Sequence, residues 1–173
     1  MPGITDRSTA APLLRPRFIS HGTLESRNIH RSRRFYEEVL GFEVVQVSPI
    51  TLFIRLGGKH TYVVVESTRP NDMRSINHNG IDFASEEAVH EAHRRLLGVA
   101  EEYGITAITQ PAPNHGQFSF HFRDCDMNCW EAIHLPAGGY SFRFEDALLD
   151  LTGRHELSPD EMRAVFQRRI RSK

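Results

Sequence analysis

The sequence predicts an α+β fold that contains two copies of a βαβββ unit, followed by a C-terminal helical extension. In this 173-residue chain, two segments open at His21 and His78, and each passes through a β-prone run into a helix-like stretch. These stretches end at Gly41 and Gly104, and three further β-prone runs follow each glycine. The pattern stops after Leu135. An internal duplication with a period of about 50–60 residues usually decides the fold.

The first unit opens with a predicted strand over residues 18–26, where apolar and small residues alternate. Residues 29–40 carry their apolar side chains at helical spacing, and Gly41 is suited to end this helix. Three β-prone runs follow, at residues 42–47, 51–56 and 62–66. Gly57 and Gly58, between the last two runs, predict a hairpin turn.

The second unit repeats this plan. A strand is predicted over residues 78–84, and Ser85 is suited to cap a helix that runs to about Tyr103. Three further strands are predicted at residues 105–108, 117–123 and 129–135. Residues 111–114, which include two prolines, are expected to form an irregular loop.

Beyond the two units, the pattern predicts a terminal helix in the extension. Ser158 is its expected cap, Pro159 suits the first helical position, and Glu161 can complete a capping box. The expected organisation is a flexible N-terminal arm (residues 1–17), one domain (18–135, with units at about 18–67 and 78–135) and a C-terminal extension (136–173).

Composition limits the partners and the compartment. The chain is 39% hydrophobic and 25% charged, as in ordinary soluble proteins, and its net charge of −1 favours neither nucleic acid nor an anionic membrane. No apolar run approaches the ~18 residues of a membrane span, and the arm has no signal-peptide pattern. Cys125 and Cys129 are too few for a disulfide framework and are interpreted as ordinary thiols. The expected location is cytoplasmic.

Two histidines at corresponding points of the units, and one glutamate near the end of the second unit, are candidate metal ligands. His21 and His78 head the two units, and Glu131 opens a strand after a turn at residues 124–128. Two histidines and one carboxylate form a facial set for a divalent metal with open coordination positions, above all non-haem Fe(II).

The same segments resemble the vicinal oxygen chelate superfamily, which contains glyoxalase I, fosfomycin-resistance proteins, bleomycin-binding proteins and extradiol ring-cleaving dioxygenases. The stretch from His21 to Phe42, HGTLESRNIHRSRRFYEEVLGF, is similar to its opening strand and "FY-x-x-x-LGF" helix. HNGIDF, from His78, resembles the start of its second module. DCDMNCWE, which ends at Glu131, resembles its "DPDGN-x-x-E" turn and last strand. The resemblance covers residues 18–135.

The resemblance implies that the two modules pair about a pseudo-two-fold axis into an open, cup-shaped mixed β-sheet barrel with outer helices. It also implies that His21, His78 and Glu131 meet inside the cup and bind a metal. Fe(II) is the expected ion, with Mn(II), Zn(II), Co(II) and Ni(II) as alternatives.

The strand predicted at residues 62–66 helps to distinguish between subfamilies of this superfamily. Glyoxalase I has a fourth ligand, a glutamate, near the position of Val63, and valine cannot bind a metal. Glu66 could reach that role through a bulge, but it is expected to end the strand in solvent. Lys59-His60-Thr-Tyr-Val resembles a stretch of extradiol dioxygenases that carries an acid–base histidine, so His60 is a candidate catalytic residue. The alternative is an exposed hairpin histidine.

Other histidines are weighed in the same way. His121 replaces the tyrosine of an extradiol "SFY" stretch and is a second candidate catalytic residue, able to donate a hydrogen bond to substrate. His115 resembles a substrate-binding pocket histidine only loosely. His90 and His93 share a helix face and are interpreted as surface residues.

The resulting functional hypothesis is an Fe(II)-dependent extradiol-type dioxygenase that cleaves a catecholic aromatic ring with O₂. Two alternatives stay open. One is a lyase, isomerase or thiol transferase of the glyoxalase or fosfomycin-resistance type with another divalent metal, and the other is a non-catalytic small-molecule-binding protein. Relatives of this fold often dimerise or pair modules across chains, so a homodimer or higher homo-oligomer is also open.

Overall fold

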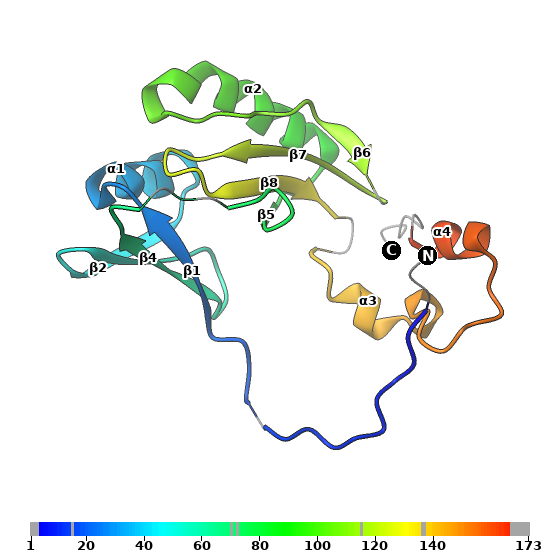
Figure 1. Ribbon diagram of the computed structural model, residues 1–173. Helices are drawn as coiled ribbons and strands as arrows, with labels where there is room; N and C mark the ends of the chain where they lie inside the picture. The colour runs from blue at the N-terminus through cyan, green and yellow to red at the C-terminus, as the bar shows by residue number, and fades with distance from the viewer. Residues whose placement is uncertain are drawn as a thin grey trace.

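Two four-stranded mixed sheets, each covered by helical segments, form the body of the protein (Figure 1). The computed structural model describes residues 4–14, 16–69, 71, 73–114, 116–135 and 138–166. The strand orders are β1-β4-β3-β2 and β5-β8-β7-β6, which place equivalent strands of the two units at equivalent positions. The predicted duplication is therefore confirmed, and neither sheet closes into a barrel by itself.

The first sheet is formed by β1 (His21–Ser26), β2 (Glu43–Ser48), β3 (Thr51–Arg55) and β4 (Thr61–Glu66). β1 runs parallel to β4, and the remaining pairs are antiparallel. The helix between β1 and β2 begins as α1 (Ile29–Arg34) and continues as a π-helical turn, η1 (Phe35–Val39). Gly41 follows with φ +68°, which confirms the predicted helix end because glycine tolerates the left-handed region.

The second sheet repeats this connectivity with β5 (Asn79–Asp82), β6 (Ala112–Asn114), β7 (Gln117–Arg123) and β8 (Cys129–His134). Its helix, α2 (Glu86–Tyr103), lies across one face of the sheet (Figure 1). Ser85 accepts a hydrogen bond from the Ala88 amide, and Gly104 ends the helix with φ +65°. Both predicted ends of this helix are confirmed.

The outer strand of the second sheet differs from the prediction. Residues 105–108 do not form a strand, because Ala107 has φ +51° and only Thr106 makes a bridge, to Arg123. The strand β6 instead uses residues 112–114, which were expected to be a loop. Pro113 fits there because β6 is an edge strand, where a missing N–H leaves no neighbour unpaired.

An aromatic cluster joins the two units. Tyr36 and Phe42, from the first unit, pack against Trp130 of β8 with ring centroids 6.2 and 5.8 Å apart. All three residues are buried. Aromatic rings bury large apolar areas, so this cluster holds the two sheets in one hydrophobic core.

The C-terminal extension contains α3 (Phe142–Glu145), a 3₁₀ turn η2 (Ala147–Leu149) and α4 (Pro159–Phe166). The predicted capping box of α4 is confirmed: the Ser158 amide donates to Glu161 Oε2 at 2.8 Å, and the Glu161 amide donates to Ser158 Oγ at 3.3 Å. In the described part of the chain, no helix has both the length and the apolar character needed to cross a membrane.

The N-terminal arm runs back from β1 to the extension (Figure 1). The Gly153 amide donates to the Thr5 carbonyl at 3.0 Å, Arg7 lies 2.8 Å from Asp150, and His155 lies 2.8 Å from Asp6. We call these contacts between residues 5–7 and 150–155 the terminal clasp. The two ends of the described chain are therefore held together beside the domain.

Candidate metal centre

One face of the second sheet carries the polar residues of the site. His121 on β7 lies directly opposite Glu131 on β8, so the two side chains share a face. On the other side of β8, Gly80 of β5 is the register partner of Glu131, and His78 stands two residues earlier. Three adjacent strands therefore bring His78, His121 and Glu131 to one place.

The three side chains form a compact set of ligand atoms. His78 Nε2 lies 3.2 Å from Glu131 Oε2, and His121 Nε2 lies 3.7 Å from Glu131 Oε1. One ligand atom from each residue lies within 4.8 Å of the others, and no other group of this kind occurs among the described residues. Because a divalent metal draws such ligands to about 2 Å from itself, the set can close around one ion.

Hydrogen bonds outside the set orient it. His78 Nδ1 lies 2.9 Å from the Ser75 carbonyl oxygen, so Nδ1 carries a proton in this contact, and Nε2 on the Glu131 side is the ring nitrogen that would bind a metal. Gln117 donates from Nε2 to Glu131 Oε1 at 3.2 Å. Metal-binding histidines and carboxylates are commonly held by partners of these kinds.

The electrostatics of the site favour a cation. Glu131 is only 3% exposed, and a buried carboxylate needs a compensating charge or several hydrogen bonds. Burial lowers the pKa of His121, and the His78 ring adds to this effect while Glu131 opposes it. A neutral His121 is the form that binds metals. The Glu131 carboxylate therefore faces two imidazole rings, and this set of donors fits a divalent metal ion.

His21 lies elsewhere in the chain. It begins β1 in the first sheet, is exposed, and has its Nδ1 2.7 Å from Ser20 Oγ. The structure thus brings His78 and Glu131 together as expected, and within one chain their third neighbour is His121 rather than His21. The metal role of His21 stays a prediction.

The other predicted residues are also separate from this set. His60 is exposed just before β4, and its ring meets the edge of Tyr62 at a centroid distance of 5.0 Å. Glu66 ends β4 and accepts a hydrogen bond from the Ile29 amide at the start of α1, at 3.0 Å. His115 lies outside the described residues.

His93 contradicts its interpretation as a surface residue. It is 7% exposed, and its ring packs against Phe120 at a centroid distance of 5.1 Å. His93 was assigned to the surface because imidazole is polar, but the side chains of α2 that face β7 are core positions.

Two residues of the site were missed by the sequence analysis. Gln117 shares a strand face with His121 because the two lie four positions apart on β7, and this alternation could have identified it. Tyr140, whose hydroxyl donates to Gln117 Oε1, comes from the extension, where no repeat or motif pointed to it.

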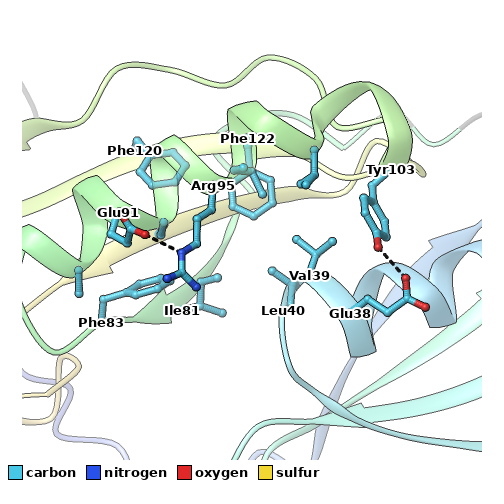
Figure 2. Close-up of a pocket in the computed structure, with 15 residues that line it drawn as sticks. Glu38, Val39, Leu40, Ile81, Phe83, Glu91, Arg95, Tyr103, Phe120 and Phe122 are labelled. Carbon is cyan, nitrogen blue, oxygen red and sulfur yellow. Dashed lines mark hydrogen bonds and ion pairs between the residues drawn. The ribbon is translucent and has the colours of Figure 1, made fainter.

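The opposite face of the second sheet carries an apolar cavity of about 670 Å³ (Figure 2). Phe120 and Phe122 alternate with His121 along β7 and point into this cavity, between α2 and the end of η1. The ion pair of Glu91 with Arg95 lies at its wall. Among the described residues that line it, none belongs to the set of His78, His121 and Glu131.

Comparisons with known proteins identify the family and the fold. The family model of the Glyoxalase/Bleomycin resistance protein/Dioxygenase superfamily matches residues 19–132. No curated protein matches the chain.

Solved structures share the fold. The fosfomycin resistance protein FosX from Mesorhizobium loti is 22% identical, with a TM-score of 0.56, 75% of this chain covered and 99% of that chain. A lactoylglutathione lyase from Agrobacterium tumefaciens is 19% identical, with a TM-score of 0.52 and coverages of 69% and 94%. A glyoxalase/bleomycin resistance protein/dioxygenase from Nocardioides is 17% identical, with a TM-score of 0.57 and coverages of 71% and 85%. At these identities the likeness concerns the fold alone.

Proposed function

Because the chain belongs to the Glyoxalase/Bleomycin resistance protein/Dioxygenase superfamily, we propose that it is an enzyme that holds a divalent metal at His78 and Glu131 and acts there on a small molecule. The observation that carries this proposal is the nearly buried Glu131 carboxylate between two imidazoles, each within 3.7 Å of one of its oxygens. A buried carboxylate without a compensating charge is costly, and a cation removes that cost.

The third ligand is an imidazole. His121 is supported by its distance from Glu131 in the same chain. His21 is supported by the resemblance of its segment to the family's first ligand strand, and it would reach the metal by pairing of modules between two copies. The two possibilities can be separated, because each predicts that a different variant loses metal binding.

The reaction that we propose is extradiol-type cleavage of a catecholic ring by O₂ with Fe(II). A set of two histidines and one carboxylate suits this ion, and the bound metal would supply a Lewis acid with open positions for two vicinal oxygens and O₂. His60 is the proposed acceptor of the substrate hydroxyl proton. If His21 is a ligand, the neutral His121 ring is free to hydrogen-bond the substrate instead.

Metal binding is the first test. We expect the wild-type protein to bind one divalent ion per chain, and we expect His78→Ala or Glu131→Ala to weaken that affinity by at least about 100-fold. The matched control is His30→Ala, because His30 is an exposed histidine on α1. Metal content after anaerobic loading with Fe(II) or Zn(II) measures the effect. Full binding by Glu131→Ala would refute the proposed site.

The same assay identifies the third imidazole. Loss of metal in His121→Ala alone would assign a site within one chain, whereas loss in His21→Ala alone would assign a site shared between two copies. O₂ uptake with a panel of catechols then tests the reaction, and His60→Ala should keep the metal but lose most turnover. Activity with Zn(II) but not with Fe(II) would favour a lyase, isomerase or transferase.

A further inference from the structure

We propose that Tyr140, from the C-terminal extension, is a positioning residue that fixes the Glu131 carboxylate through Gln117. The inference rests on the proposed function, because it assigns to the extension a role at the same metal site. Tyr140 lies beyond residues 19–132, the part that matches the family model. The proposed positioning residue therefore comes from outside the part of the chain that matches the family model.

The contacts form a continuous path. The Tyr140 hydroxyl donates to Gln117 Oε1, and Gln117 Nε2 donates to Glu131 Oε1 at 3.2 Å. Gln117 and Glu131 are 6% and 3% exposed, so water competes little for these bonds.

The hydroxyl determines which way the Gln117 amide faces. A glutamine amide can rotate by half a turn and exchange its oxygen with its nitrogen. With Tyr140 as donor, the oxygen must face Tyr140, and the NH₂ group must then face Glu131. Removal of the hydroxyl leaves both orientations open, and one of them turns the amide oxygen toward the carboxylate, which repels it.

This arrangement holds the carboxylate in one plane. Gln117 and His121 approach Oε1 of Glu131, while His78 approaches Oε2. The two Glu131 oxygens are therefore held in defined orientations before a metal binds. Preorganised ligands bind a metal more tightly because less freedom is lost on binding, and partners of metal ligands typically change affinity by about 10–100-fold.

Local backbone turns shape the chain on both sides of Tyr140. Backbone hydrogen bonds join Gly138 to the Leu135 carbonyl at 2.8 Å and Arg143 to the Tyr140 carbonyl at 3.1 Å, on either side of the tyrosine. Farther along, the terminal clasp ties residues 150–155 to residues 5–7. Tyr140 itself is 47% exposed, so its hydroxyl can be removed with little loss of core packing.

The test is the metal affinity of Tyr140→Phe and Gln117→Met, with Zn(II) as probe in competition with a chromogenic chelator. We expect each variant to weaken the affinity about 10-fold, and the double variant to weaken it by no more than about the same factor, because both break one path. The melting temperature in the presence of a chelator should stay at the wild-type value for Tyr140→Phe, which separates positioning from stability.

The matched control is Tyr103→Phe. The Tyr103 hydroxyl donates to Glu38 Oε2 at 2.6 Å beside the apolar cavity, away from the metal face (Figure 2). The chemical change is the same, and we expect wild-type affinity for Zn(II). Equal weakening in Tyr103→Phe would overturn the inference.

The outcomes distinguish the two proposals. If wild-type protein binds Zn(II) and Glu131→Ala does not, but Tyr140→Phe binds like wild type, the inference fails and the metal site stands. If the losses of Zn(II) affinity in Tyr140→Phe and Gln117→Met add up in the double variant, the two residues do not act through one path, and the inference also fails. If wild-type protein binds no metal, both proposals fail.

Discussion

The carboxylate of Asp124 organises the turn that precedes β8. Its Oδ1 accepts hydrogen bonds from the amides of Asp126 and Asn128, both at 2.9 Å, and its Oδ2 accepts one from Trp130 Nε1 at 3.0 Å. Burial raises the pKa of Asp124 to about 6, although the bonds from Trp130 and Asn128 lower it. This turn sets where β8 begins and thus where Glu131 stands.

The same turn departs from the "DPDGN" motif of the family at Cys125 and Met127. Met127 occupies the position of the glycine in the "DPDGN" motif and has φ +69°. A left-handed conformation costs a side-chain-bearing residue about 1 kcal/mol. The hydrogen bond from Arg123 Nη1 to the Met127 carbonyl, at 2.8 Å, helps to hold this conformation.

His93 gives a prediction for a single buried side chain. Its Nε2 has no hydrogen-bond partner among the described residues, and its ring packs on Phe120. Because an unsatisfied buried nitrogen costs roughly 1–3 kcal/mol, His93→Leu should raise the free energy of unfolding by about 1 kcal/mol. Urea denaturation measures this change. A decrease of the same size would mean that the imidazole makes a contact that leucine cannot replace.

At the level of elements, the ends of α2 follow from local chemistry. Ser85 caps the start through its hydroxyl, and Gly104 ends the helix in the left-handed region, with its amide bonded to the Ala100 and Glu101 carbonyls. The Arg31 guanidinium from α1 lies where a Cβ on residue 104 would be. The end of α2 therefore depends on glycine both for its backbone and for close contact with α1.

This end of α2 yields a second stability prediction. Gly104→Ala should lower the free energy of unfolding by about 1–2 kcal/mol, because alanine resists positive φ and the Arg31 side chain must move. Gly98→Ala is the control, since Gly98 lies within the helix with open space around its Cα, and it should stabilise by about 0.5–1 kcal/mol. Thermal and urea unfolding should show a lower stability for Gly104→Ala and a higher stability for Gly98→Ala. Changes of the same sign in the two variants would contradict this prediction.

At the level of the whole molecule, long-range contacts join segments that are far apart in sequence. The Asn128 side chain donates from Nδ2 to the Glu25 carbonyl at 3.0 Å, which ties the turn of the second unit to β1 of the first. The Arg27 amide donates to Asp126 Oδ1 at 2.8 Å in the same region. The terminal clasp then holds the arm and the extension together at the other side of the domain.

The terminal clasp gives a prediction about local order. The double substitution Asp6→Ala and Arg7→Ala should leave the main unfolding transition unchanged, because exposed ion pairs contribute little to stability. Hydrogen–deuterium exchange of residues 150–155 should nevertheless rise by several-fold, since the two ion pairs that hold Thr5 beside Gly153 are removed. Arg163→Ala, which breaks an ion pair within α4, is the control. Unchanged exchange at Gly153 would mean that the extension holds its place without the arm.

Much of the fold was predictable because its signals are local. The helix-ending Gly41 and Gly104, the caps at Ser85 and Ser158, and the repeated βαβββ order depend on residues a few positions apart. The error at residues 105–114 has a local cause as well: Ala107 adopts positive φ, and an edge strand accepts Pro113. Propensity could not reveal either feature.

For the site, the sequence by itself determined that His21 and His78 head the two units and that Glu131 follows the turn at residues 124–128, and the resemblance indicated a metal at these residues. Only the tertiary structure decided that His121 stands opposite Glu131, that His21 lies in the other sheet, and that Tyr140 reaches the site through Gln117. The physical reason is the separation along the sequence between the residues that interact. Spacing along the chain sets helices, strands and turns, whereas cross-strand register and the packing of an extension depend on contacts between residues that are distant in sequence.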